Sequence, residues 1–263
     1  MKTSRLIRLL LFAAVIAGSL SSFNILNPVD PVKTPVKKNA GVADGKGFAV
    51  LELFTSEGCS SCPPADELMA SIQKETKGEP VYVLAYHVDY WDRLGWKDVF
   101  SSSEYSNRQS QYGRWLNVAP IYTPMVIING KLVFVGSDET AIRHSISGQL
   151  GTSPAATLSL QAVQEGERLN IKYQTTHVGI GSRLLIAIVQ KSAQTKVARG
   201  ENAGHLLSHI QIVRKLQNEK LSAGEGSASV DLPKGFNTQD WEVLALVQDQ
   251  SNGEILAVAK TKL

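Results

Sequence analysis

The sequence predicts an α/β domain with a helical, aromatic-rich insert, followed by a smaller all-β, sandwich-like domain. Three observations indicate this order. Apolar runs that suit buried strands alternate with helical patterns over residues 47–151. Aromatic residues gather between about 88 and 122. Short strand signals separated by turns recur over residues 152–263. A chain of 263 residues is long enough for two such domains.

The first strand and helix flank the two cysteines of the chain. Phe48–Phe54 is an apolar run with one charge, which suits a buried strand. After a short turn comes Cys59-Ser-Ser-Cys62, and Pro63 and Pro64 follow it directly. Because proline is tolerated in a first helical turn, we expect a helix to begin here and to run to about Ile72.

The rest of this domain reads as a strand, the insert, a hairpin and a helix. Val81–Tyr86 is a second apolar strand. Asn129-Gly130 lies between two apolar runs and predicts a β-hairpin. Ser137 or Asp138 can then cap a final helix. Its apolar face would carry Ile142, Ile146 and Leu150.

The insert holds three of the four tryptophans and four of the seven tyrosines. Such aromatic surface near a reactive site can hold an apolar substrate, and Trp91 and Tyr122 are the candidates for that role. The alternative is a small helical subdomain that uses the aromatic side chains as its core. We interpret His87 and Asp89 as residues that order the insert.

The second domain shows repeated strand patterns with turns between them, which suggests a β-sandwich. Residues 205–216 fit a strand or a helical face. His205 and His209 lie four apart, but no Glu stands between them as a metalloprotease helix would need. We interpret them as solvated or capping side chains.

The amino-terminal segment has the pattern of a secretory signal. Three basic residues precede an apolar run in residues 1–22, and small residues follow. We expect export to the periplasm or the medium, with an uncleaved N-terminal anchor as the alternative and the only membrane contact. Residues 23–46 carry three prolines and four lysines and read as a linker.

Charge and motifs exclude several classes of function. Residues 1–40 hold six Lys/Arg and one Asp, whereas the rest holds 21 basic and 23 acidic residues. The body of the chain therefore gives no electrostatic case for nucleic acid. We also find no nucleotide-binding glycine loop and no nucleophile elbow, and we expect no cofactor.

The cysteine pair is the candidate reactive group. Two thiols in one turn can close a disulfide, and a thiol at a helix N-terminus is favoured as the thiolate, which is the attacking species in disulfide exchange. We expect Cys59 to be the exposed nucleophile and Cys62 the buried resolving thiol, with hydroxyls of Ser60 and Ser61 stabilising the thiolate. A static structural disulfide and a soft-metal site are the alternatives.

This order of elements, with Cys-x-x-Cys at the first helix, is similar to the thioredoxin fold. Thr123-Pro124, directly before the hairpin, resembles the cis-proline that lies against the cysteine pair in that fold. The resemblance implies a substrate groove shaped by Pro124 and lined by Thr123. It also implies a buried acid near the position of Glu52, which would accept a proton from Cys62. The alternative is that Glu52 pairs with a cation or faces solvent.

The sequence is also similar to an exported bacterial and plant family catalogued as domain of unknown function 1223. The resemblance rests on five segments: Leu51–Asp66, His87–Asp92 with Gly95-Trp96, Tyr122–Pro124, Arg199–Asn202 and Ile212–Arg214.

We therefore expect an exported thiol-disulfide oxidoreductase that acts on thiol or disulfide proteins. In it Cys59 attacks and Cys62 resolves. One alternative is a copper-binding or delivery protein in which Cys59, Cys62 and His87 resemble the site of thioredoxin-fold copper chaperones. The other is a non-enzymatic envelope binding module in which the disulfide only fixes the turn.

Overall fold

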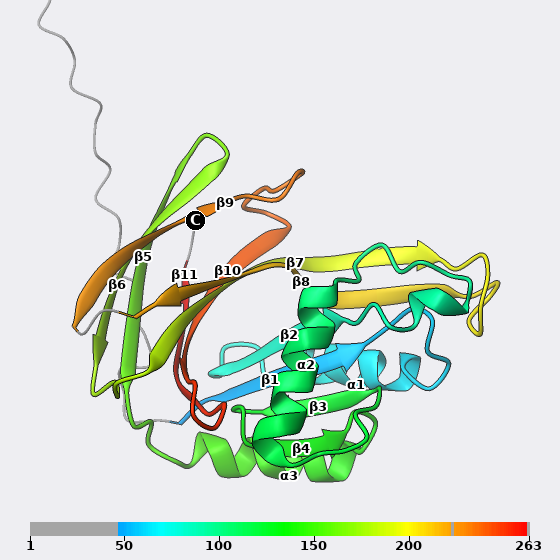
Figure 1. Cartoon of the computed structure of the whole chain (residues 1–263), viewed down its shortest axis with the longest axis horizontal. Helices are drawn as coiled ribbons and strands as arrows, with labels where there is room; N and C mark the ends of the chain where they lie inside the picture. The colour runs from blue at the N-terminus through cyan, green and yellow to red at the C-terminus, as the bar shows by residue number, and fades with distance from the viewer. Residues whose placement is uncertain (1–46, 222–223, 262–263) are drawn as a thin grey trace, which may run out of the picture. The chain divides into compact units, whose positions relative to one another are not determined.

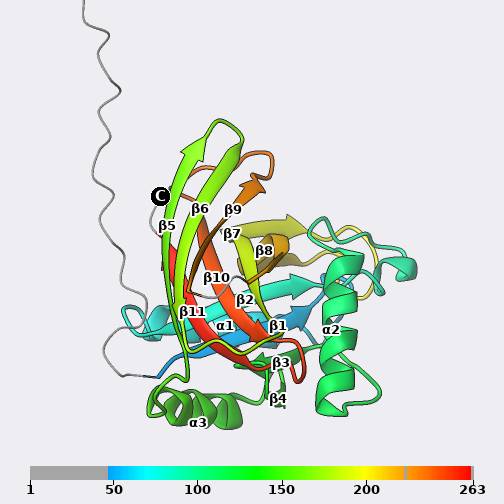
Figure 2. The same cartoon turned by 60° about the vertical axis from the view of Figure 1, so that its left-hand side comes forward.

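The structure, a computed structural model, describes residues 47–221 and 224–261. Within these residues, the strands form an eight-stranded mixed sheet and a separate three-stranded antiparallel sheet. Three α-helices flank the larger sheet (Figure 1 and Figure 2). The expected mixed α/β class is therefore confirmed. The expected signal segment (1–22) and linker (23–46) lie outside the described residues.

The elements in chain order are β1 (Ala49–Thr55), α1 (Pro63–Glu75), β2 (Val81–His87), the 3₁₀ helix η1 (Asp92–Leu94), α2 (Ser103–Leu116), β3 (Met125–Ile128), β4 (Leu132–Val135), α3 (Glu139–Leu150), β5 (Thr157–Glu165), β6 (Arg168–Thr176), β7 (Ser182–Lys196), β8 (Leu206–Lys220), β9 (Glu225–Asp231), β10 (Trp241–Asp249) and β11 (Ile255–Thr261). The strand order is β11-β10-β7-β8-β2-β1-β3-β4 in the larger sheet and β5-β6-β9 in the smaller one.

The elements expected in the first half all form. β1 pairs with β2 in parallel and with β3 antiparallel. The β3–β4 hairpin turns at Asn129 and Gly130, whose φ angles of 48° and 71° are those of the tight turn that Asn-Gly favours. Asp138 caps α3 by accepting a hydrogen bond from the backbone N–H of Ala141 at 3.1 Å. Ile142 and Ile146 are buried as the helical pattern predicts.

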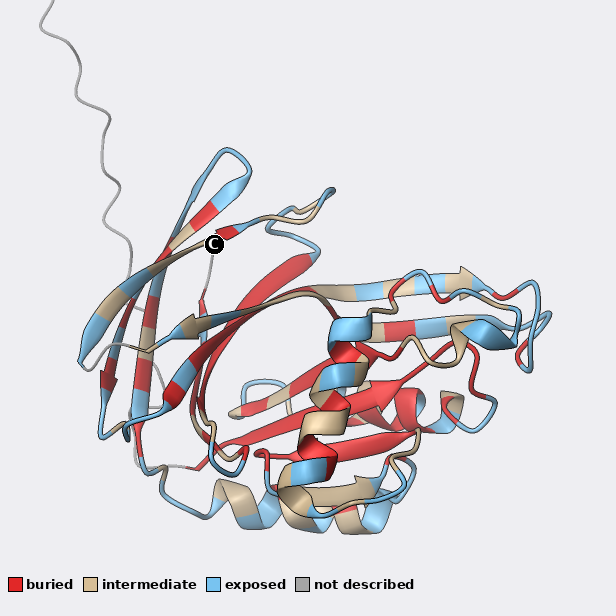
Figure 3. Ribbon diagram, viewed as in Figure 1, coloured by how far each residue is buried: buried red, intermediate tan, exposed pale blue. Residues whose placement is uncertain are grey.

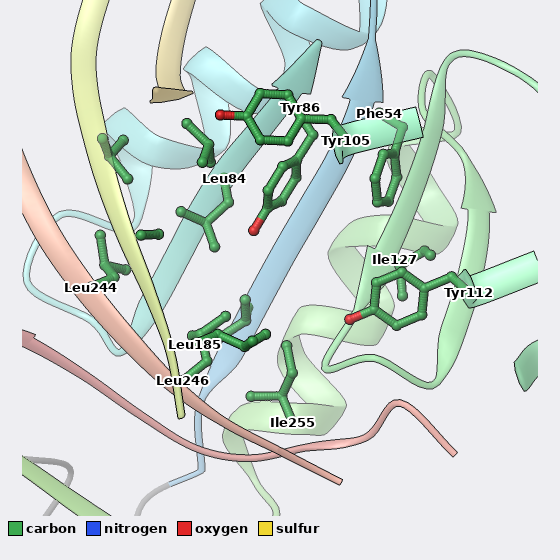
Figure 4. Close-up of a cluster of buried hydrophobic side chains, with 14 of the residues drawn as sticks. Phe54, Leu84, Tyr86, Tyr105, Tyr112, Ile127, Leu185, Leu244, Leu246 and Ile255 are labelled. Atoms are coloured by element: carbon green, nitrogen blue, oxygen red, sulfur yellow. The ribbon is translucent and has the colours of Figure 1, made fainter. Parts of the chain in front are cut away.

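The alternating side chains of β1 enter two different cores. Leu51 and Leu53 face α1 and α3, whereas Val50 and Phe54 face α2. On the second face, Tyr105 and Tyr112 of α2 join side chains from β2, β7, β10 and β11 (Figure 4). The insert aromatics thus build one wall of the main core, not a separate subdomain core.

The second half differs from a self-contained sandwich, because β7, β8, β10 and β11 extend the larger sheet. β8 joins β2 in parallel at Ala85 and Ile212. Residues 205–216, which fitted a strand or a helix, belong mostly to this strand. The smaller sheet packs on the extension through a shared apolar cluster that includes Leu160, Ile171 and Ile186.

The most deeply buried strands are those of the larger sheet that have side chains packed on both faces (Figure 3). β1 and almost all of β10 are buried, whereas the outer part of the β7–β8 hairpin alternates between half-buried and exposed. None of the helices among the described residues is long and apolar enough to cross a membrane.

Candidate functional site

Cys59 and Cys62 form a disulfide at the junction between β1 and α1. Their Cα atoms are 5.4 Å apart. The turn is held by backbone hydrogen bonds from Cys59 N–H to the Ser56 carbonyl and from Cys62 N–H to the Cys59 carbonyl, both 3.2 Å. Pro63 is the first residue of α1, as the two prolines predict.

Both cysteines are fully buried, with 0% of each residue exposed. The expectation that Cys59 is exposed is therefore wrong. The physical reason is that Trp91 and Asn202 lie against the turn, although Ser60 and Ser61 between the cysteines are exposed. The expected hydroxyl contact is present, because Ser61 Oγ lies 3.4 Å from Cys59 Sγ.

The Thr123–Pro124 peptide is cis, as the resemblance to the thioredoxin fold implies. Trp91 connects this loop to the cysteine turn. Its indole N–H donates to Thr123 Oγ1 at 2.8 Å, and its Cβ lies 3.1 Å from where a Cβ on Gly58 would be. The structure therefore connects the cis-proline loop to the cysteine turn through Trp91, whereas a substrate groove at this place stays a prediction.

Pro124 itself packs close to the first turn of α1. Gly136 lies between Pro124 and Ala65, where an added Cβ would be 2.8 Å and 2.9 Å from their Cβ atoms. Tyr122 is half-buried against the main core, and its carbonyl accepts a hydrogen bond from Gln109 at 2.7 Å. Tyr122 thus packs inside the insert, and the expectation that it binds a substrate stays a prediction.

Glu52 is fully buried on the sheet face that carries α2. Its Oε1 accepts from the guanidinium of Arg108 at 2.6 and 2.9 Å, and its Oε2 accepts from the Tyr112 hydroxyl. Pairing with a cation was one of the two expectations for this residue. α1, which follows Cys62, packs on the opposite face, so the geometry gives the proposed proton transfer from Cys62 no support.

Behind the cysteine turn lies a buried acid–histidine cluster, which we define as Glu57, Asp66, His87, Asp98 and His209. All five residues are at most 8% exposed. They come from the turn itself, α1, β2, the insert and β8.

One half of this cluster fixes the insert. Nδ1 of His87 lies 2.6 Å from Asp98 Oδ2, which also accepts from the backbone N–H of Glu57 at 2.9 Å. Burial raises the pKa of Asp98, but the charge and hydrogen bond of His87 and two backbone N–H groups outweigh it and leave the pKa below its usual value. Asp89 orders the insert in a similar way, because its carboxylate accepts from Ser106 Oγ at 2.5 Å. The interpretation of His87 and Asp89 is therefore confirmed.

The other half of the cluster holds a buried imidazole between two carboxylates. His209 Nε2 lies 3.3 Å from Glu57 Oε1, and its Nδ1 lies 4.0 Å from Asp66 Oδ1. Burial lowers the pKa of His209, but the nearby carboxylates of Asp66 and Glu57 outweigh it and raise the pKa to about 9. His209 therefore carries a positive charge at neutral pH directly behind the disulfide turn.

Sequence reasoning missed this half of the cluster. His209 was interpreted as solvated or capping, whereas it is 3% exposed. The signal was present in Glu57 and Asp66, two acids that lie close to the cysteine motif on either side. When such carboxylates are buried, a nearby cation offsets the cost of their charge. The cation comes from a strand more than 140 residues later, which spacing cannot indicate.

Across residues 47–221 and 224–261, no group of three or more His, Cys, Asp or Glu side chains is arranged to hold a metal ion. Within the candidate copper set, Cys59 and Cys62 are bonded to each other and His87 Nδ1 is paired with Asp98.

A family described as "Protein of unknown function (DUF1223)" matches residues 50–248. The chain belongs to this family. The match includes the cysteine turn, the cis-proline loop and most of the second half, and it confirms the resemblance seen in the sequence. A comparison with curated proteins gave no match.

Among solved structures, the chain is similar to protein AGR_C_4864 from Agrobacterium tumefaciens, with 26% identity and a TM-score of 0.63. The match covers 81% of this chain and 92% of that one. A DUF3823 family protein from Bacteroides ovatus and a domain of the outer membrane lipoprotein Omp28 from Porphyromonas gingivalis align at 10% identity, with TM-scores of 0.28 and 0.27. They cover 41% and 42% of this chain, and 53% and 88% of their own.

Proposed function

We propose that this protein is an exported thiol-disulfide oxidoreductase with a thioredoxin-like first half, and that its partners are thiol or disulfide proteins. The observation that carries the proposal is the Cys59–Cys62 disulfide at the β1–α1 junction, with Trp91 connecting it to the cis Thr123–Pro124 peptide. Export to the periplasm or the medium follows from the signal pattern of residues 1–22 and suits a protein whose cysteines are oxidised.

The chemistry is an exchange of disulfide bonds. A substrate thiolate attacks Cys59 Sγ, so that a substrate–Cys59 bond forms, the Cys59–Cys62 bond breaks and Cys62 leaves as a thiolate. A second substrate thiolate attacks the substrate sulfur and releases Cys59. The substrate loses two electrons, the cysteine pair gains them, and the two thiol protons pass to the released cysteines. The reverse sequence reduces a substrate disulfide.

The local environment favours the thiolates that this exchange needs. The amino-terminal end of α1 carries partial positive charge. Pro63 and Pro64 have no N–H to offer there. The hydroxyl of Ser61, 3.4 Å from Cys59 Sγ, is therefore the side-chain donor that the structure offers. Once the disulfide is reduced, this hydroxyl is in position to donate a hydrogen bond to the Cys59 thiolate.

One observation favours a second candidate function, a binding module in which the disulfide only fixes the turn. Both sulfur-bearing residues are fully buried, which an attacked disulfide seldom is. The reduction potential of the Cys59–Cys62 pair distinguishes these two functions. A midpoint of roughly −120 to −270 mV in glutathione buffers supports exchange, and one below about −300 mV supports a structural disulfide.

The experiment that tests the proposed function traps the mixed disulfide. We expect the free Cys59 thiolate of Cys62→Ser to attack a disulfide-bearing protein and to hold it as a stable mixed disulfide. The second sulfur of the substrate leaves as a thiol, and the resolving thiol that would release the adduct is absent. Cys59→Ser should form far less adduct, since Cys62 lies behind the turn. Equal trapping by both variants, or by neither, would contradict the assigned order of attack. Non-reducing electrophoresis and mass spectrometry give the measurement.

A further inference from the structure

The connection between β7 and β8, which we call the 197–205 loop, covers the disulfide turn. Figure 1 and Figure 2 both show it at the end of the sheet where β1 runs into the turn. Asn202, 6% exposed, donates its side-chain amide to the Glu57 carbonyl at 2.9 Å and to the Cys59 carbonyl at 3.0 Å. Glu201 Oε2 accepts from the backbone N–H of Ser60 at 3.0 Å.

These three hydrogen bonds join residues more than 140 positions apart in the chain. They use backbone groups of the turn on both sides of Cys59. The hydroxyl and N–H of Ser60 also lower the pKa of the exposed Glu201 carboxyl, which keeps this acceptor charged. The loop thus contacts the turn through one amide that donates and one carboxylate that accepts.

An amide donor and a carbonyl-like acceptor are the two groups that an extended polypeptide carries along its backbone. A segment lying beside Cys59 would donate an N–H to the Cys59 or Glu57 carbonyl and accept from the Ser60 N–H. Asn202 and Glu201 already occupy these positions. The loop therefore stands where such a segment would dock.

The loop is also built as a compact turn on a long hairpin. Val197 N–H donates to the His205 carbonyl at 3.0 Å, and Gly204 N–H donates to the Val197 carbonyl at 2.9 Å. Gly200 and Gly204 have φ angles of +83° and +86°, which glycine adopts without strain. The loop can therefore leave the turn as a unit without loss of its own hydrogen bonds.

A small cavity lies beside the covered turn. It has a volume of about 100 Å³ and is lined by Pro63, Asp66 and Glu67 of α1 and by Leu206–His209 of β8. Leu206, 59% exposed, stands at its rim. The cavity offers space for a small side chain that neighbours a docked cysteine.

We propose that the 197–205 loop occupies the backbone groups around Cys59 to which a substrate would bind. The partner is an extended polypeptide segment that carries cysteine, and it displaces Glu201 and Asn202 before sulfur exchange. This inference rests on the proposed exchange function and names its substrate class and its control.

The test compares rates of disulfide reduction in the full chain and in a variant with Glu201→Ala and Asn202→Ala. The probes are a reduced, extended peptide with two cysteines and dithiothreitol. We expect the peptide to reduce the variant at least about tenfold faster than the parent, since three hydrogen bonds no longer oppose docking. The control Gln164→Ala removes one exposed hydrogen bond, to the Gly166 carbonyl at the β5–β6 turn of the smaller sheet, and should leave the rate unchanged.

An unchanged or slower rate with the peptide would overturn the docking inference, provided that dithiothreitol still reduces both proteins. If neither probe reduces either protein and the midpoint lies below about −300 mV, the proposed function itself fails and this inference fails with it. Should the double variant not fold, Glu201→Gln is the second variant. It changes an exposed side chain, weakens the acceptor for Ser60 and should accelerate the peptide reaction several-fold.

Discussion

His209 shows how one residue of the second half sets the electrostatics of the cysteine turn. A buried imidazolium offsets the charge of Glu57 and Asp66, which burial alone would penalise. The His87 ring packs edge-on against the His209 ring, with centroids 4.9 Å apart. His87 pairs with Asp98, not with Glu57 or Asp66. One buried cation therefore serves two buried carboxylates, and removal of His209 would leave both without a positive charge beside them.

We expect a pH dependence of stability that belongs to His209. Its pKa in the folded protein, about 9, lies above its ordinary value of 6.5, so folding takes up a proton between these values. The stabilisation is complete below about pH 6.5 and is lost as the pH rises through about 9. Its size is on the order of 3 kcal/mol.

Urea unfolding between pH 6 and 10 of the parent and of His209→Gln gives the measurement. The free energy of unfolding of the parent should fall more steeply across this range than that of the variant. The difference between the two slopes isolates His209, because the remaining titratable groups, including Glu57 and Asp66, are common to both proteins. Parallel slopes would show that His209 is neutral in the folded state.

At the level of elements, one glycine decides how closely the β10–β11 hairpin approaches α2. Gly253, between β10 and β11, has a φ angle of +86°. A Cβ at this position would lie 2.5 Å from the indole of Trp115 in α2. The Gly253 carbonyl also accepts from Gln248 at 2.7 Å. The hairpin between β10 and β11 thus reaches α2 only because no side chain intervenes.

We expect Gly253→Ala to destabilise the fold by about 3 kcal/mol, through backbone strain and overpacking against Trp115. The matched control is Gly235→Ala. Gly235 has a φ angle of +83° but no atom within 4 Å of the added Cβ, so only the strain of about 1 kcal/mol remains. Urea midpoints of both variants measure the difference. Equal losses would mean that the indole moves aside at no cost.

Local patterns predicted the elements around the cysteines well. The apolar run before Cys59, the prolines after Cys62 and the Asn129-Gly130 turn each depend on neighbours in the sequence. The same patterns could not show which sheet a later strand joins. β8 reads as one more strand of a sandwich, yet it pairs with β2 through Ile212, and this choice is decided by packing.

The candidate site was predictable to a similar extent. Cys59, Cys62 and the cis-proline loop came from motifs, and the structure brings them together through Trp91. The burial of Cys59 and the role of Asn202 were not predictable, because both depend on a loop that meets the turn from more than 140 residues away. Sequence spacing carries no information on such a contact.

At the scale of the whole molecule, the two halves share their largest apolar cluster. Leu84 and Tyr86 of β2 pack with Leu185 of β7 and Leu244 of β10. Polar contacts cross the same junction: the Asn129 carbonyl accepts from the backbone N–H of Ile255 at 3.0 Å, and Gln248 donates to the Tyr112 hydroxyl at 2.7 Å. Separation of the halves would expose this core and remove the hydrogen bonds that Gln248 makes with Tyr112 and Arg108.

We therefore expect the oxidised chain to unfold in one cooperative transition, although the sequence divides it at about residue 151. Variants that keep only Trp115, in α2, or only Trp241, in β10, report on each half separately. Their urea midpoints, read by tryptophan fluorescence and compared with circular dichroism, should coincide. The β2–β8 junction has only one register pair, Ala85 with Ile212, so the shared cluster has to supply the coupling. Midpoints that differ between the two tryptophans would show that the cluster does not couple the halves, and that each folds as its own domain.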